Sequence, residues 1–151
     1  MIKFSIYGCG ADKRLKRRIG AAAVFFLKAL IPRKRNIEIR IKLVKGMLAN
    51  ENTYGECYDL DASQHNDYYT IRLDYNDTDT DTLIRTLAHE MIHIKQFSRG
   101  ELRMLYSGYC ARWKGKNYAD NTDYEECPWE IEANTLEPAL SAAFISKYPL
   151  V

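Results

Sequence analysis

Two histidines and a glutamate stand together in the stretch TLAHEMIHIKQF, which runs from Thr86 to Phe97. His89 and His93 are four residues apart, so a helix would present both on one face, where they could hold one metal ion. Glu90 is rotated about 100° from His89 around such a helix. It could reach a water on the metal without ligating the metal, which is the position that a general base requires. The spacing predicts a catalytic metal site; the alternative is a helix that carries two histidines and no metal.

A third ligand must come from another element, because a catalytic zinc takes three protein ligands and leaves one position for water. No histidine follows His93. The extended motif H-E-x-x-H-x-x-G-x-x-H is not met, since Gln96 and Arg99 stand where it needs Gly and His. The third ligand is therefore expected to be a carboxylate or a cysteine. Two imidazoles and a carboxylate suit zinc that activates water, whereas thiolates are commoner in structural or redox sites.

The segment CPWEIEAN offers two carboxylates, Glu130 and Glu132, near the start of an otherwise apolar helix. Glu130 shares a helix face with Asn134, whose side-chain oxygen could hold an imidazole N–H of the site. This geometry favours Glu130 over Glu132 as the ligand. The alternative is that both acids only complement the dipole at the helix N-terminus.

Together these motifs resemble the gluzincins, zinc peptidases whose third ligand is the Glu of an E-x-x-x-D/N helix. HEMIH and EIEAN carry the resemblance. The small size and the order of the elements are similar to those of the compact minigluzincins. EIEAN is also similar to the E-x-x-A-N segment of ImmA/IrrE-type peptidases, although TLEPAL replaces their usual continuation. HEMIHIKQF, WKGK and PWEIEA together look most like short phage-encoded proteins labelled SprT-like metallopeptidases.

The resemblance extends from about Leu83 to Leu136 and implies zinc, held by His89, His93 and Glu130, and peptide-bond hydrolysis. It also implies a location in the cytoplasm of an infected host cell or on a phage particle. True SprT-like proteins carry a third His soon after H-E-x-x-H and often a zinc ribbon, and this sequence has neither. The role of that family on DNA–protein crosslinks is therefore not implied.

A peptidase also needs a hydrogen-bond donor for the oxyanion of its tetrahedral intermediate. Gluzincins commonly use a Tyr or a His, and the resemblance implies a Tyr here because no later His remains. Tyr124, a few residues before Glu130, is the first candidate and Tyr118 the second. The stretch RWKGK, Arg112 to Lys116, is either an edge of the cleft or a solvated loop anchored by Trp113.

Hydrophobic periodicity predicts the elements that position these residues. The third histidine, His65, lies in a polar connection between two predicted strands, 53–62 and 67–75. We expect it to face solvent rather than bind a metal. The predicted elements are a strand over 1–8, a helix from the N-cap Asp12 to about Leu30, a strand over 36–47, a hairpin of strands over 53–62 and 67–75, a helix from Asp79 or Thr80 to Arg99 that Gly100 ends, a helical stretch over 101–113, and a last helix over 128–148, continuous or divided near Pro138.

These elements predict one small α+β domain over residues 1–151, with a zincin-like arrangement. An N-terminal helix backs a sheet of three or four strands, mainly antiparallel. The H-E-x-x-H helix lies under the sheet, and the C-terminal helix carries the glutamate ligand. Such an arrangement would bring the two halves of the candidate site together.

Charge is unevenly distributed along a chain whose net charge is only +2. Basic residues gather over 13–18 and 33–35, and acidic residues over 74–81 and 120–126. We expect Lys13 to Arg18 to form a solvated face; the alternative is a weak nucleic-acid contact.

No segment has the roughly 20 apolar residues that a membrane span requires, since Lys28 interrupts the longest apolar run. The cysteines form no C-x-x-C motif. They are expected to be reduced thiols of a cytoplasmic protein, with a Cys110–Cys127 disulfide as the alternative.

The function expected from the sequence is that of a zinc metallopeptidase that acts on a peptide or protein, with Glu90 as the general base. One alternative is a non-catalytic zincin-like module that binds a partner or forms part of a phage particle. A further alternative is a nucleic-acid-associated protein that uses the basic N-terminal helix.

Overall fold

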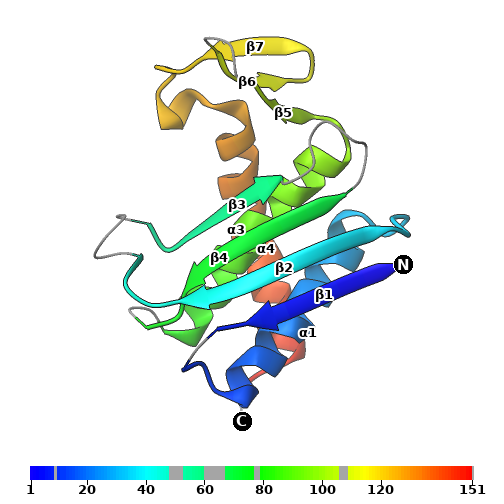
Figure 1. The fold of residues 1–151 in the computed structure, drawn as a ribbon, viewed down its shortest axis with the longest axis vertical. Coiled ribbons are helices and arrows are strands. Elements are labelled where there is room, and N and C mark those ends of the chain that lie inside the picture. Colours follow the sequence, from blue (N-terminus) through cyan, green and yellow to red (C-terminus); the bar gives the residue numbers. More distant parts are fainter. Residues whose placement is uncertain (9, 48–52, 60–66, 77–78, 106–108, 151) are drawn as a thin grey trace.

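The computed structural model describes residues 1–8, 10–47, 53–59, 67–76, 79–105 and 109–150. Over these residues, three α-helices and two β-sheets form an α+β fold, as predicted (Figure 1). The elements in chain order are β1 Ile2–Tyr7, α1 Lys13–Leu30, β2 Ile37–Val44, β3 Gly55–Asp59, β4 Tyr68–Asp74, α3 Thr80–Ser98, β5 Leu102–Met104, β6 Tyr109–Trp113, β7 Lys116–Ala119, the 3₁₀ helix η1 Tyr124–Glu126 and α4 Pro128–Lys147.

The larger sheet has four strands in the order β1-β2-β4-β3. The pairs β1–β2 and β2–β4 are parallel, and α1 makes the crossover that the first of these pairs requires. β3 runs antiparallel to β4 at one edge, as the predicted hairpin requires. Counting both sheets, three of the five strand pairings among the described residues are antiparallel, while the larger sheet itself is mixed.

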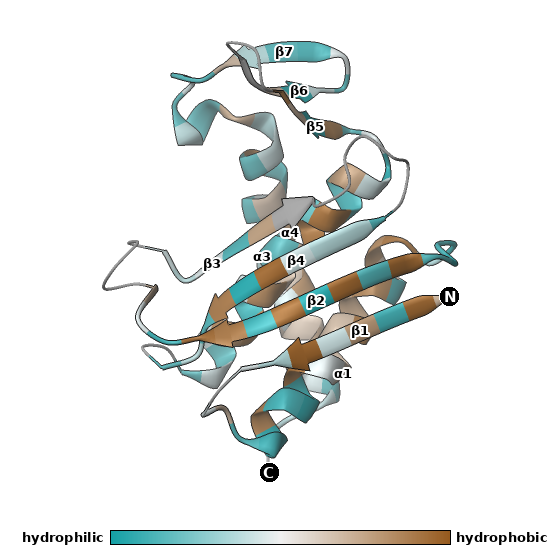
Figure 2. Ribbon diagram, in the orientation of Figure 1, coloured by the Kyte–Doolittle hydropathy of each residue, from teal (hydrophilic) through white to brown (hydrophobic). Residues whose placement is uncertain are grey.

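The helices α1 and α3 cover one face of the larger sheet, and α4 packs against α3 (Figure 1). The sequence of β2 explains why one face is covered, because apolar and polar residues alternate along this strand (Figure 2). Ile39 and Ile41 are buried, whereas Arg40 between them is exposed. Burying each such side chain contributes roughly 1.5–3 kcal/mol. The helices complete this core with Ile19, Ala23 and Phe26 of α1, Leu83, Ile84, Leu87 and Met91 of α3, and Phe144 of α4.

Both helices that cover the sheet begin at the predicted caps. Asp12 accepts a hydrogen bond from the backbone N–H of Leu15 at 2.7 Å, and Asp79 accepts one from Thr82 at 2.7 Å. Each aspartate satisfies an N–H that has no partner within its helix. Gly100, with φ of 71°, follows the end of α3 and confirms the predicted stop.

The prediction of a helix over residues 101–113 is wrong. This segment contains β5 and β6, which join β7 in a small antiparallel sheet. Ala111 and Trp113 are buried and Arg112 between them is exposed, which is the alternation of a strand. The buried side chains pack against Cys127 and Trp129, in a second cluster beside the main core. Tertiary packing therefore overrides the helical propensity of the segment.

RWKGK is the turn of this small sheet and not an irregular loop. Lys114 and Gly115 both have positive φ, 47° and 88°, as the central residues of a tight hairpin turn do. Trp113 anchors the hairpin in the second cluster, as in the second of the two alternatives given for this stretch.

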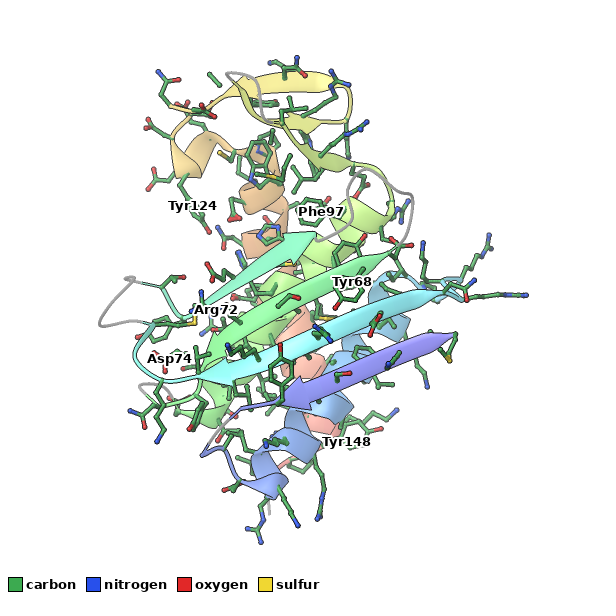
Figure 3. All side chains as sticks on the ribbon, in the orientation of Figure 1. Tyr68, Arg72, Asp74, Phe97, Tyr124 and Tyr148 are labelled. Atoms are coloured by element: carbon green, nitrogen blue, oxygen red, sulfur yellow. The ribbon has the colours of Figure 1, made fainter. Side chains whose placement is uncertain are left out.

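One continuous helix, α4, connects the two clusters. Pro128 occupies its first turn, where the missing N–H has no intrahelical partner to lose. Pro138 lies within the helix without dividing it. The first turns bury Trp129 in the second cluster, and the later turns bury Phe144 in the main core. Phe97 of α3 packs against both clusters (Figure 3). This packing sets where the start of α4 lies against α3.

Candidate metal centre

His89, His93 and Glu130 come together where α3 packs against the first turn of α4. Nε2 of His93 lies 2.7 Å from Oε1 of Glu130, and Nε2 of His89 lies 3.4 Å from Oε2. The candidate ligand atoms of the three residues all lie within 4.8 Å of one another. The structure thus brings together the three residues predicted as ligands, and this group could hold a metal ion.

An unsatisfied oxygen in this group fits a bound cation. Oε2 of Glu130 is buried and makes no hydrogen bond within the described part of the chain; its nearest polar neighbour is Nε2 of His89 at 3.4 Å. A buried carboxylate oxygen without a hydrogen bond is costly. An ion among the two imidazoles and the carboxylate would satisfy this oxygen, and these donors are ones that zinc binds.

The charges of the group are coupled. Burial opposes the ionisation of Glu130, but His89 and His93 beside it hold the pKa of its carboxyl well below its usual range. Burial likewise disfavours the charged form of His93, but contact with Glu130 outweighs it and raises the pKa of that imidazole. Glu130 therefore offers an ionised carboxylate to any cation at this position.

Glu90 is a buried acid on the neighbouring face of α3, with 6% of its surface exposed. Burial raises its pKa to about 7, although the adjacent His93 and His89 oppose the shift. A carboxyl group that titrates near neutral pH can both accept and return a proton. Glu90, the predicted base, is thus a buried acid beside the two histidines.

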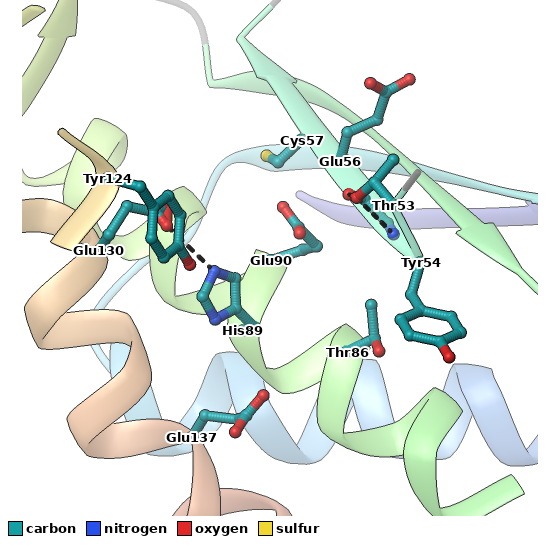
Figure 4. Close-up of a pocket in the computed structure, with 11 residues that line it drawn as sticks. Thr53, Tyr54, Glu56, Cys57, Thr86, His89, Glu90, Tyr124, Glu130 and Glu137 are labelled. Carbon is teal, nitrogen blue, oxygen red and sulfur yellow. Dashed lines mark hydrogen bonds and ion pairs between the residues drawn. The ribbon is translucent and has the colours of Figure 1, made fainter. Parts of the chain in front are cut away.

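His89, Glu90 and Glu130 face a cleft of about 400 Å³ between the edge strand β3, α3 and the start of α4 (Figure 4). Gly55 lets β3 approach α3 closely, because a Cβ at this residue would lie 2.6 Å from Cγ2 of Thr86. The residues that line the cleft are Thr53, Tyr54, Gly55, Glu56, Cys57, Thr86, His89, Glu90, Tyr124, Glu130 and Glu137. Glu90 and two of the three candidate ligands are thus reachable from solvent.

The two candidate tyrosines lie in different places. Tyr124 lines the cleft beside Glu130 (Figure 4), and partial burial together with the Glu130 carboxylate raises the pKa of its phenol to about 12. It therefore keeps its O–H at neutral pH. Tyr118 packs edge-on against Trp129, with ring centroids 5.5 Å apart, and does not line the cleft. Of the two, only Tyr124 has access to the candidate metal centre.

The predicted role of Asn134 is corrected by the structure. Its amide donates to the hydroxyl of Tyr124 at 3.4 Å. The ring of His93 is held instead by Gln96, whose Oε1 lies 2.8 Å from Nδ1. Gln96 stands three residues after His93 on the same helix, so the spacing HxxQ could have indicated this contact.

Glu132, the alternative ligand, contacts Lys95 and Gln96 instead of the two histidines. Its Oε1 accepts hydrogen bonds from Lys95 Nζ at 2.8 Å and Gln96 Nε2 at 3.1 Å. Burial opposes its ionisation, but these donors hold the pKa of Glu132 below its usual value. Of the two acids of CPWEIEAN, the structure brings Glu130 to the histidines.

The basic run Lys13–Arg18 begins α1. Lys13, Arg14 and Arg17 are exposed, as expected for a solvated face. Arg18 differs, since it donates to the backbone oxygen of Tyr148 at 2.7 Å and joins α1 to the end of α4.

Two further sequence predictions concern residues only partly covered by the structure. Cys127 is buried in the second cluster and Cys57 lines the cleft. His65, Cys9 and the side chain of Cys110 lie outside the described residues, and with them the disulfide alternative. None of the described helices has the length and apolar character needed to cross a bilayer.

The chain was compared with protein-family models, with curated proteins and with solved structures. None of the three comparisons gives a match.

Proposed function

We propose that the protein is a zinc-dependent metallopeptidase. The observation that carries the proposal is the convergence of His89, His93 and Glu130 beside the buried Glu90, in a cleft open to solvent. A buried acid whose pKa is raised by burial, beside candidate metal ligands in an open cleft, is typical of functional sites. The arrangement supports hydrolysis assisted by a metal.

Zinc is the metal that this donor set favours. Two imidazoles and one carboxylate are typical of catalytic zinc sites, in which three protein ligands leave one position open. His89, His93 and Glu130 would hold the ion. Bound zinc supplies a water of lowered pKa and polarises the carbonyl of a substrate.

The side chains around the ligands divide the remaining work. Glu90 takes the proton of the attacking water and returns it to the amine that leaves. Tyr124 keeps its phenolic proton and donates a hydrogen bond to the oxyanion. Together these groups provide the proton transfers and the charge stabilisation that amide hydrolysis needs.

An extended peptide is the substrate that the cleft fits best. β3 is the edge strand of the larger sheet and contributes Gly55, Glu56 and Cys57 to the cleft wall. An edge strand has unpaired backbone groups that can pair with an added strand. A peptide bound in this way would run past Glu90 and the ligands.

The test is the variant Glu90→Gln, assayed with a set of quenched fluorogenic peptides of varied sequence. We expect turnover to fall by about 10²–10⁴-fold, because the base is lost. The zinc content should be unchanged, because Glu90 is not a ligand. The exposed η1 variant Glu125→Gln is the matched control and should keep full turnover.

Two outcomes would overturn this proposal. Full activity in Glu90→Gln would remove Glu90 as the base. A wild-type protein that holds zinc and cleaves none of the peptides would favour the non-catalytic module instead.

A further inference from the structure

We propose that a relay from Glu132 through Gln96 positions His93, so that Nε2 of the ring faces the metal. The proposal rests on the metal site described above and assigns a role to two side chains that are not ligands. Gln96 is completely buried, one turn after His93 on α3. A buried amide is retained at little cost only where all its hydrogen bonds are made.

The surroundings of Gln96 fix which end of its amide faces the histidine. Nε2 donates to the backbone oxygen of Trp129 at 2.9 Å and to Oε1 of Glu132 at 3.1 Å. Both partners can only accept, so a flipped amide would set its oxygen against two other oxygens. Oε1 must therefore face Nδ1 of His93, 2.8 Å away.

This orientation in turn fixes the tautomer of His93. Oε1 of Gln96 accepts and cannot donate, so Nδ1 must carry the proton. In the metal-bound form the imidazole is neutral and has this one N–H, which leaves the lone pair on Nε2 for the ion. Nε2 is the atom that faces Glu130, so His93 is oriented as a ligand by contacts made outside the metal site.

Glu132 contributes its charge to the relay. Lys95 holds its carboxylate through a contact of 2.8 Å, and Lys95 also contacts Glu101, which precedes β5, at 2.8 Å. The carboxylate polarises the amide of Gln96 and so makes Oε1 a stronger hydrogen-bond acceptor. A stronger hydrogen bond at Nδ1 makes Nε2 of His93 more basic, and therefore a better metal ligand. Glu132, which is not a ligand, is thus two hydrogen bonds away from the candidate ligand His93.

The simpler alternative is that Gln96 only joins α3 to α4 through the backbone of Trp129. Two variants separate the roles. Gln96→Met removes all three hydrogen bonds of the amide, to His93, Trp129 and Glu132. The double variant Gln96→Glu with Glu132→Gln also loses the hydrogen bond to Trp129. It keeps the rest of the relay, because the carboxylate at position 96 accepts from His93 and the amide at position 132 donates to that carboxylate.

The experiment measures the zinc affinity of the full chain by competition with a chromophoric chelator. We expect Gln96→Met to weaken zinc binding by about 10–100-fold, the usual effect of losing an outer-shell partner. The double variant should bind zinc about tenfold more tightly than Gln96→Met. The exposed α4 variant Thr135→Ala is the control and should bind as the wild type does.

Long-range ¹H–¹⁵N spectra of the zinc-loaded wild type give an independent reading. They should show a proton on Nδ1 of His93 and none on Nε2. A proton on Nε2, or equal loss of affinity in Gln96→Met and the double variant, would overturn the relay. If Gln96→Met does not fold, the spectra and the affinity of the double variant decide. A wild type that binds no zinc would instead refute the metal site itself.

Discussion

Oε1 of Glu130 lies 2.7 Å from Nε2 of His93, although the two residues belong to different helices. The contact exists only because α4 packs along α3, with Trp129 in the second cluster and Phe144 in the main core. A metal at this junction would join two elements that are far apart in the sequence. Its binding energy would therefore contribute to the stability of the fold.

Removing the metal should lower the unfolding temperature. An ion present at a thousand times its Kd stabilises the folded state by about 4 kcal/mol. For a domain of this size that corresponds to roughly 8–16 °C. Differential scanning fluorimetry with zinc and then with excess chelator measures the shift. The double variant His89→Ala/His93→Ala should show no shift, and a shift of equal size in that variant would refute the link to these ligands.

Tyr124→Phe should reduce kcat while leaving zinc binding intact. Removing one donor to an oxyanion typically costs about 10²–10³-fold in kcat. Steady-state assays on any peptide that the wild type cleaves measure the change. The matched variant is Tyr118→Phe, whose ring packs on Trp129 outside the cleft and whose kcat should stay the same. Equal kcat in wild type and Tyr124→Phe would assign the oxyanion donor to another group.

Gly55→Ala should push β3 away from α3. The added Cβ would lie 2.6 Å from Cγ2 of Thr86 and 3.2 Å from the backbone oxygen of Arg72. Overpacking of this kind costs about 1–3 kcal/mol, measured as the free energy of unfolding in urea. Combining it with Thr86→Ser removes the closest contact and should recover part of the loss. If Gly55→Ala is as stable as the wild type, the close approach of β3 is not required.

Local spacing was enough to find half of the site. His89, Glu90 and His93 lie within one helix, and their relation follows from its 3.6-residue period alone. Glu130 was also identified, but through its pairing with Asn134, which in the structure donates to Tyr124 instead. The ligand prediction matches the observed cluster, and the supporting contact does not.

What the sequence could not show depends on contacts between elements. Glu132 faces Lys95 and Gln96 only because of how α4 is rotated against α3, which no local pattern records. The hairpin of β6 and β7 was missed for a different reason. Its alternation spans only Ala111 to Trp113, too short to outweigh the helical propensity of the segment, although the turn at Lys114 and Gly115 was a usable signal.

The central claim is tested most directly by the zinc content of two purified variants, Glu130→Gln and Glu132→Gln. The two acids are two residues apart on the same helix, and both are partly buried, so the substitutions are closely matched. At saturating zinc followed by desalting, the wild type should retain about one ion per chain and Glu130→Gln far less. Glu132→Gln loses only the relay to His93 and should retain clearly more zinc than Glu130→Gln. Equal zinc in Glu130→Gln and the wild type would contradict the account.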